Sequence, residues 1–217
     1  MILHSLKQQI QKLNTTHFCD AGHGVRTLSP HVKSFAGSTK MVGLAYTIRS
    51  EGGLLPVYHG LQQASPSHVL VIDGCGSPYA LADGLVAAEA KQKRLAGIIV
   101  AGVCRDVDTI TKVGLPFYAS ATNPVKAHIN NNKGQAQIPL MIAGTPIYPN
   151  EFIIGDNNGV IVLSEEELFT LMPIAEVIQK RENRVLFSLK HGGSVLDLLT
   201  PQEPMHQTQA TETIEYA

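Results

Sequence analysis

The hydrophobic pattern of this chain changes between helical spacing and short continuous apolar runs, which predicts a mixed α/β fold. Leu6, Ile10 and Leu13 recur at helical spacing, so residues 3–14 are expected to form an amphipathic helix. A second short helix, capped from Thr15-Thr16, is expected through residues 18–20. Runs of branched aliphatic residues that end in glycine or charge predict strands at 41–49, 68–73, 97–102, 115–119 and 138–142.

The most regular stretch is the one from residue 68 to residue 102. The strand 68–73 leads into a loop at 74–78, a helix near 80–94 and a second apolar strand. Strand, helix and strand in close succession predict a right-handed βαβ unit with parallel strands that are covered on both faces. One face of this helix is expected to carry Leu81, Leu85, Ala88 and Leu95.

The last third of the chain predicts a hairpin followed by a helix. A turn-rich segment at 155–159 joins two strands, and Ser164 with Glu167 forms a capping box. Pro173 is expected to restart the helix, which should end at Gly192-Gly193. Residues 1–199 are therefore predicted to be a single domain, and residues 200–217, which lack apolar periodicity, a flexible tail.

Composition narrows the function classes. The chain is 44% hydrophobic and 16% charged, with a net charge of −1. It has no stripe of basic residues, so direct binding to nucleic acid is not expected. No apolar run is long enough to span a membrane, so a cytoplasmic protein is expected. The three cysteines form no CxxC pair and are expected to be small, partly buried apolar residues. The nine histidines form no HxH or HExxH motif.

Two loops at the carboxyl ends of the βαβ strands carry candidate chemistry. Gly74-Cys75-Gly76 is a weak match to a dinucleotide fingerprint or a methyltransferase loop, because Tyr79 stands where the former needs its third glycine. A tight turn is the favoured interpretation. If the following helix begins around Asp83–Val86, its free amides could hold one end of a small anionic substrate; equally, Asp83 could cap the helix or face solvent.

Arg105-Asp106 directly follows the second strand of this unit, at the same edge. Arginine offers a fork for a carboxylate, and aspartate offers a hard oxygen for a divalent cation. The pair could therefore hold a 2-oxo acid from two sides. A solvated ion pair or an aspartate at a helix start is the alternative for such a common dipeptide.

Several segments together resemble the RraA-like family (regulator of ribonuclease E activity A). They are the segments LNTTHFCDAG, VLVIDGCGSPYALADGLVAAEAKQKRLAGIIVAGVCRDVDTI and GDNNGVIVLSEEEL, and the resemblance extends over about residues 5–190. It implies an α/β domain of swivelling β/β/α type with a C-terminal helix, assembled as a homotrimer or hexamer. It also implies a class II, metal-dependent aldolase that cleaves 4-hydroxy-4-methyl-2-oxoglutarate to pyruvate and decarboxylates oxaloacetate.

The resemblance assigns roles to individual residues. Asp106 corresponds to the metal-binding aspartate, for Mg²⁺ or Mn²⁺, and Arg105 to the substrate-binding arginine. The stretch Asp83, Gly84, Leu85 and Val86 corresponds to the one whose backbone contacts substrate. The chain departs from the family where many aldolases have glycine followed by an acidic residue instead of Asp83-Gly84, and where Thr109 replaces an acidic residue. Both departures remove carboxylates near the expected metal site.

A glutamate from a neighbouring subunit is a further expectation. On the last helix, Glu182 is predicted to lie at the edge of an apolar stripe, whereas Glu176 should point to solvent. The members of this stripe are Ile174, Val177, Ile178, Val185 and Leu189. Because the family's aldolases use such a glutamate, Glu182 is the candidate; pairing with Arg181 or a surface lysine is the alternative. The alternative function is a non-enzymatic regulator that binds ribonuclease E or a related complex, and a methyltransferase is a third, weaker hypothesis.

Overall fold

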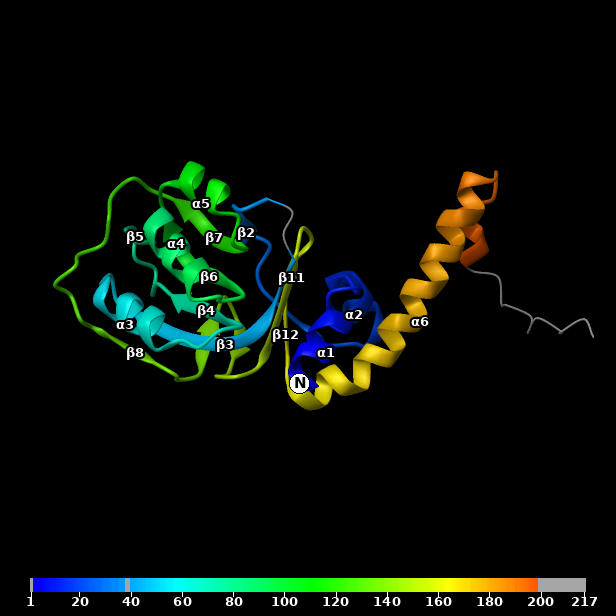
Figure 1. Cartoon of the computed structure of the whole chain (residues 1–217), viewed down its shortest axis with the longest axis horizontal. Coiled ribbons are helices and arrows are strands. Elements are labelled where there is room, and N and C mark those ends of the chain that lie inside the picture. The colour runs from blue at the N-terminus through cyan, green and yellow to red at the C-terminus, as the bar shows by residue number, and fades with distance from the viewer. Residues whose placement is uncertain (1, 38–39, 199–217) are drawn as a thin grey trace, which may run out of the picture. The chain divides into compact units, whose positions relative to one another are not determined.

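The structure is a computed structural model that describes residues 2–37 and 40–198 (Figure 1). The helices are α1 (Ile2–Ile10), α2 (Thr15–Ala21), α3 (Leu55–Gln63), α4 (Gly84–Gln92), α5 (Val107–Val113) and α6 (Glu165–Lys190), with a 3₁₀ turn η1 (Val195–Leu198). The strands are β1 (Arg26–Thr27), β2 (Lys33–Ser34), β3 (Met41–Ser50), β4 (His68–Asp73), β5 (Ala80–Ala82), β6 (Gly97–Cys104), β7 (Phe117–Thr122), β8 (Gly134–Ala136), β9 (Leu140–Ile142), β10 (Thr145–Ile147), β11 (Phe152–Asp156) and β12 (Gly159–Leu163).

A mixed sheet forms the centre of the fold. Its main path runs β1-β12-β11-β3-β4-β6-β7-β2, with β8 paired to β3 and β5 paired to β6. The strands β3, β4, β6 and β7 are parallel, whereas β11, β12, β1 and β2 join the sheet antiparallel. The carboxyl ends of four parallel strands therefore lie along one edge of the sheet, where ligands bind in open α/β sheets.

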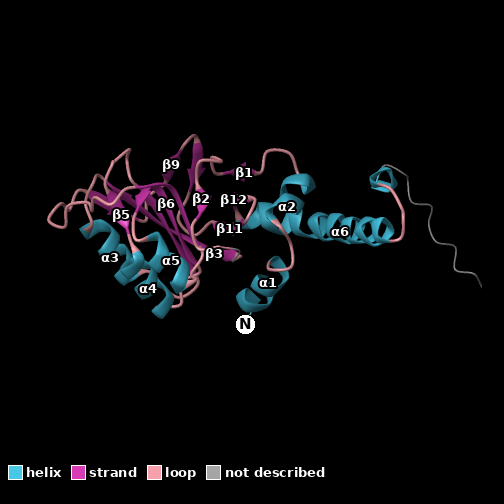
Figure 2. Cartoon of the chain, turned by 90° about the horizontal axis from the view of Figure 1, so that it is seen from above, coloured by secondary structure: helices cyan, strands magenta, loops and turns pink. Residues whose placement is uncertain are grey.

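The sheet is covered on both faces. Helices α3, α4 and α5 pack on one face, as Figure 2 shows, over a core that includes Ile48, Leu70 and Phe117. The hairpin of β9 and β10 covers the other face over a second core around Met41 and Ile99. This arrangement is the predicted α/β fold with a βαβ core and a C-terminal helix.

The predicted βαβ unit is confirmed, with two corrections. Strands β4 and β6 are adjacent and parallel, and α4 lies between them in sequence. The expected helix near 80–94 begins only at Gly84, because Ala80–Ala82 pair with β6 as the strand β5. The predicted apolar face is wrong in part: Leu81 and Leu95 are buried but lie outside α4, whereas Leu85 is 74% exposed. The buried side chains of α4 are Val86, Ala87 and Ala90.

Two details of the terminal helices differ from the prediction. Helix α2 has Asn14 as its N-cap, rather than Thr15-Thr16, because the Thr15 hydroxyl and amide donate to Asp156 instead. The capping box is confirmed, since the Ser164 amide donates to Glu167 and the Glu167 amide to the Ser164 hydroxyl, at 2.6 and 3.1 Å. Pro173 does not restart a helix but lies inside the continuous α6.

The chain divides into two compact units, Met1–Ile178 and Gln179–Ala217. The predicted apolar stripe of α6 is mostly exposed, at 44% for Ile174 and 64% for Val177, whereas Ala175 is buried. The helix ends near Gly192, as predicted, where the Gly193 amide donates to the Ser188 carbonyl. The predicted tail at 200–217 lies outside the described residues.

Candidate functional site

The candidate site residues predicted from the sequence gather at the carboxyl edge of the parallel strands. Arg105 and Asp106 follow β6 directly, and Asp83 follows β5, the short strand paired to β6. The Arg105 amide donates to the Ala82 carbonyl at 3.1 Å, which fixes the two loops against each other. As a result, Asp83, Gly84, Arg105 and Asp106 form one cluster at the N-termini of α4 and α5.

Asp83 is the buried anchor of this cluster. Its backbone is extended, and its Oδ1 accepts the Leu85 and Val86 amides, each at 3.1 Å, so that it caps α4. Only 5% of its side chain is exposed, and its Oδ2 lies 3.4 Å from Arg105 Nη2. The two amides that were expected to hold a substrate anion therefore donate to the chain's own carboxylate.

Asp106 precedes α5 in the same way but does not cap it. Its backbone is left-handed, with φ 58° and ψ 44°, and its side chain makes no cap hydrogen bond. A capping side chain normally requires an extended backbone, and aspartate is one of the few residues that tolerates the left-handed region. Because 49% of its side chain is exposed, its carboxylate is available to a ligand.

Arg105 lies between the two carboxylates. Its Nη2 faces Asp83 Oδ2 at 3.4 Å, and its Nε lies 3.7 Å from Asp106 Oδ2. Among the described residues, Nε of Arg105 is one of two buried side-chain nitrogens without a hydrogen-bond partner. Because 27% of its side chain is exposed and one of its donors is unsatisfied, this guanidinium retains capacity to bind an anion.

Lys126 completes the cluster, and the sequence reasoning did not identify it. Its Nζ lies 3.9 Å from Asp83 Oδ2 and 5.9 Å from the centre of the Tyr58 ring. Its backbone is held beside β5, because Ala80 donates to Val125 and Ala127 donates to Ala80. The available signal was its position shortly after the predicted strand 115–119, just beyond Asn123-Pro124.

The two departures from the family pattern are parts of a single contact. Gly84 packs directly on Thr109, and a Cβ at Gly84 would lie 2.4 Å from the Thr109 Cγ2 atom. No side chain fits there without movement, because real Cβ contacts are longer. Glycine at 84 and threonine at 109 therefore depend on each other, and both leave the site without the additional carboxylates of the family pattern.

The glycine loop forms a tight turn, as predicted. The Cys75 amide donates to Asp73 Oδ1 at 2.9 Å, and the Ser77 amide to the Gly74 carbonyl at 2.9 Å. A cavity of about 460 Å³ opens beside it. This cavity is lined by Arg49, Glu51, Gly52, Gly74, Cys75, Gly76, Ser77, Tyr79, His128 and Asn131.

Cys104 is the last residue of β6 and lies next to Arg105 in the chain. Burial raises the pKa of Cys104, the residue before Arg105, to about 11, so that it is a neutral thiol near pH 7. All three cysteines were predicted to be partly buried. Cys104 is buried, but Cys19 and Cys75 are exposed.

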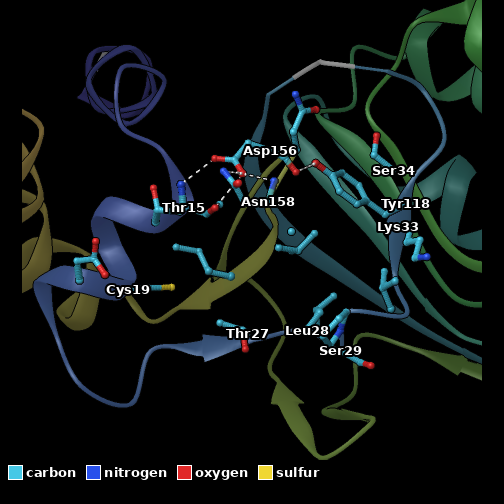
Figure 3. Close-up of a pocket in the computed structure, with 18 residues that line it drawn as sticks. Thr15, Cys19, Thr27, Leu28, Ser29, Lys33, Ser34, Tyr118, Asp156 and Asn158 are labelled. Carbon is cyan, nitrogen blue, oxygen red and sulfur yellow. Dashed lines mark hydrogen bonds between the residues drawn. The ribbon is translucent and has the colours of Figure 1, made fainter. Parts of the chain in front are cut away.

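A larger cavity of about 740 Å³ lies away from this cluster (Figure 3). There Asp156 accepts the Thr15 amide and hydroxyl at 2.7 and 2.8 Å, and the Tyr118 hydroxyl donates to the Asp156 carbonyl at 2.9 Å. These three polar residues satisfy one another.

Glu182 lies on α6 in the unit Gln179–Ala217, and its predicted role stays a prediction. Glu176 is half-buried rather than solvated, which removes the expected contrast in exposure between the two glutamates.

None of the described helices is long and apolar enough to cross a membrane.

Comparison with known proteins identifies relatives of this chain. The RraA-like family model (Aldolase/RraA) matches residues 15–162. The 4-hydroxy-4-methyl-2-oxoglutarate aldolase of Thermus thermophilus is 32% identical over 134 residues, which cover 61% of this chain and 81% of the relative. A protein of Halalkalibacterium halodurans named "Putative 4-hydroxy-4-methyl-2-oxoglutarate aldolase" is 31% identical over 157 residues, covering 71% of this chain and 74% of the relative.

Solved structures share the fold. The RNA-processing inhibitor RraA from Thermus thermophilus is 31% identical, with a TM-score of 0.66, and covers 70% of this chain and 93% of its own. An uncharacterised protein from Pseudomonas syringae is 20% identical, with a TM-score of 0.78 and coverage of 91% and 98%. The second likeness supports the fold alone.

Proposed function

Because this chain belongs to the RraA-like family, we propose that it is a lyase that cleaves a carbon–carbon bond in small 2-oxo acids. The substrates we propose are 4-hydroxy-4-methyl-2-oxoglutarate, cleaved by an aldol reaction, and oxaloacetate, which loses CO₂. The relatives that carry the aldolase name support this proposal. The single structural observation behind it is the buried Arg105 Nε, which has no hydrogen-bond partner and lies beside an available Asp106 carboxylate.

Arg105 is proposed to bind the carboxylate next to the 2-oxo group. Its guanidinium has donors that neither Asp83 nor Asp106 satisfies at hydrogen-bond distance, apart from the long Nη2 contact of 3.4 Å. When the bond between C3 and C4 breaks, its electron pair passes into the enolate of pyruvate, and the positive charge of Arg105 stabilises it. The C4 hydroxyl loses its proton to a base, and C3 of the enolate is then protonated to give pyruvate.

The residues present fit a divalent cation that takes one carboxylate from this chain and most of its other ligands from water. Among the described residues, no three His, Cys, Asp or Glu side chains are placed to hold a metal ion together, which excludes a protein cage there. Asp83 is occupied by two amides and two cationic groups, but Asp106 is half-exposed and free of a cap hydrogen bond. Mg²⁺ and Mn²⁺ accept such sites, with one carboxylate and several waters. Bound at Asp106, the cation would polarise the 2-oxo oxygen.

The base and the assembly belong to the same proposal. We propose that Glu182 of a neighbouring subunit, or a water, takes the proton of the C4 hydroxyl. We also propose that the chain forms a trimer or a pair of trimers. Exposed apolar side chains stand next to site residues in the chain, at 74% for Leu85 and 51% for Val125. Exposed apolar surface of this kind supports the proposed assembly. Light scattering should give at least a trimer at micromolar concentration, and a monomer would contradict the assembly.

Purified protein should release pyruvate from both substrates in the presence of Mg²⁺ or Mn²⁺, as a coupled assay would measure. EDTA should inhibit, and either metal should restore the rate. Release that continues in EDTA would contradict metal dependence, and no release from either substrate would contradict the lyase.

The second candidate is a regulator of RNA processing that binds ribonuclease E. Two observations favour it: the structure of an RNA-processing inhibitor is 31% identical to this chain, and the Gly84–Thr109 contact replaces carboxylates of the family pattern. Purified ribonuclease E should then bind the chain and lose activity, even where Asp106 is replaced. Because Asp106 is central to the lyase alone, the Asp106→Ala variant separates the two functions.

A further inference from the structure

The two cationic groups of the cluster have more donors than their carboxylates use. Arg105 and Lys126 approach the same oxygen, Asp83 Oδ2, at 3.4 and 3.9 Å. An ammonium has three donors and a guanidinium five, whereas this oxygen offers two lone pairs and lies at the outer limit of bonding distance. The cluster therefore has spare positive capacity beside a buried carboxylate that is already satisfied by two amides.

The two carboxylates face different nitrogens of the Arg105 guanidinium. Asp106 Oδ2 lies nearest Nε, whereas Asp83 Oδ2 faces Nη2 and is also approached by the Lys126 ammonium. A substrate whose carboxylate and 2-oxo group are held by Arg105 and Asp106 has the rest of its carbon chain free. The Lys126 ammonium approaches the oxygen that faces Nη2, a different nitrogen from the Nε that faces Asp106.

Lys126 is held in position yet remains accessible. Backbone hydrogen bonds of 2.8 and 3.0 Å from the neighbouring residues tie its segment to β5. Its ammonium lies over the Tyr58 ring, a contact that limits the freedom of a long side chain. Because 34% of the side chain is exposed, the ammonium can still meet a bound molecule.

We propose that Lys126 binds the second carboxylate of a dicarboxylic 2-oxo acid and thereby selects dicarboxylic over monocarboxylic substrates. This inference rests on the proposed function, because it assumes that the first carboxylate binds Arg105. Asp83 then has a positioning role: it keeps Arg105 and Lys126 side by side, although both are positive. A charge-assisted hydrogen bond from Lys126 would favour the dicarboxylic ligand about tenfold or more.

Binding of two unreactive ligands tests this directly. Calorimetry with Mg²⁺ would compare 2-oxoglutarate, which has two carboxylates, with pyruvate, which has one; neither has the C4 hydroxyl that cleavage needs. Wild type should bind 2-oxoglutarate more tightly. Lys126→Gln should lose about tenfold or more in affinity for 2-oxoglutarate while binding pyruvate as before. Lys126→Arg should retain part of the preference, and Lys133→Gln, at an exposed lysine, should retain all of it.

The outcomes separate this inference from the lyase proposal. Equal losses for both ligands in Lys126→Gln, no loss, or no preference in wild type would overturn the assignment, even in a protein that releases pyruvate. A selective loss of 2-oxoglutarate binding would support it, even if the protein releases no pyruvate. Failure of wild type to bind either ligand would overturn both proposals. Unchanged thermal melting of the variants confirms that each comparison concerns folded protein.

Discussion

Two arginine–carboxylate clusters in this chain differ in how completely they are satisfied. Arg26 makes a bidentate pair with Glu151 at 2.7 and 2.9 Å, and a third bond to Glu167 at 2.8 Å. Arg105 lies 3.4 and 3.7 Å from its carboxylates, and its Nε has no hydrogen-bond partner. The first cluster has few hydrogen-bond donors left for a ligand, whereas the second has donors that its own carboxylates do not satisfy.

The two clusters also differ in what they connect. Arg26 joins β1 to the segment before β11 and to the first turn of α6, so it links parts of the chain 125 and 141 residues apart. The Arg105 cluster lies at the carboxyl edge of the parallel strands, where the backbone of Asp106 is left-handed. Complete, bidentate ion pairs hold structural elements together, whereas the loosely paired groups of the Arg105 cluster leave donors for a ligand.

The largest expected effect concerns Asp106. Asp106→Ala should lower metal-dependent pyruvate release by at least about 100-fold, because the cation loses its only proposed protein ligand. Binding of Mn²⁺, followed by its electron paramagnetic resonance signal, should weaken in parallel. The matched control is Asp108→Ala, in the first turn of the same helix and exposed. Equal effects of the two variants would contradict the role of Asp106.

An intermediate effect is expected at the closed cluster. Arg26→Gln should lower the free energy of unfolding by about 2–3 kcal/mol, because it leaves two partly buried carboxylates without their partner. Urea denaturation would measure this. Arg49→Gln removes a half-exposed arginine that lies 3.6 Å from Glu51, and it should change the free energy of unfolding much less, because exposed ion pairs contribute little. If Arg26→Gln cost no more than Arg49→Gln, the closed cluster would not be a structural one.

The smallest effect is the pH dependence of the same cluster. Burial alone would raise the pKa of Glu167, but the Ser164 amide and Arg26 outweigh it and hold the pKa below its ordinary value of 4.5. A lowered carboxyl pKa stabilises the fold above the ordinary value, and this contribution is lost as pH falls through the folded-state pKa. Melting temperatures of wild type and Glu167→Gln should therefore differ most near neutral pH and converge below pH 4.5. A constant difference would argue against this linkage.

The comparison also shows how much of the molecule the sequence predicts. The βαβ unit and the Ser164–Glu167 capping box were correctly predicted, because apolar runs and capping signals are local. Residues 80–82 were predicted as helix, yet they pair with β6: the alanines favour a helix, but tertiary pairing overrides that weak preference. The contact of Arg26 with Glu167 has no local signal at all.

The candidate site follows the same rule. Arg105 and Asp106 were found because they end an apolar strand and match a family motif. Lys126 was missed because its approach to Asp83 depends on the pairing of its segment with β5, 46 residues earlier in the chain. The Gly84–Thr109 contact joins two departures that appear unrelated in the sequence, since it forms only when α4 and α5 pack together. Sequence reasoning therefore found the ends of strands but not the contacts between loops.

The most direct test compares the loss of Arg105 with the loss of Arg26 in one activity assay. Pyruvate release from oxaloacetate with Mg²⁺ would be measured for wild type, Arg105→Gln and Arg26→Gln, at a temperature where all three are folded. Arg105→Gln should lower kcat/KM by about 100- to 1,000-fold without changing the melting temperature. Arg26→Gln should stay within about threefold of wild type but melt earlier. Full activity in Arg105→Gln, or a comparable loss in both variants, would contradict the assignment of the open cluster as the active site.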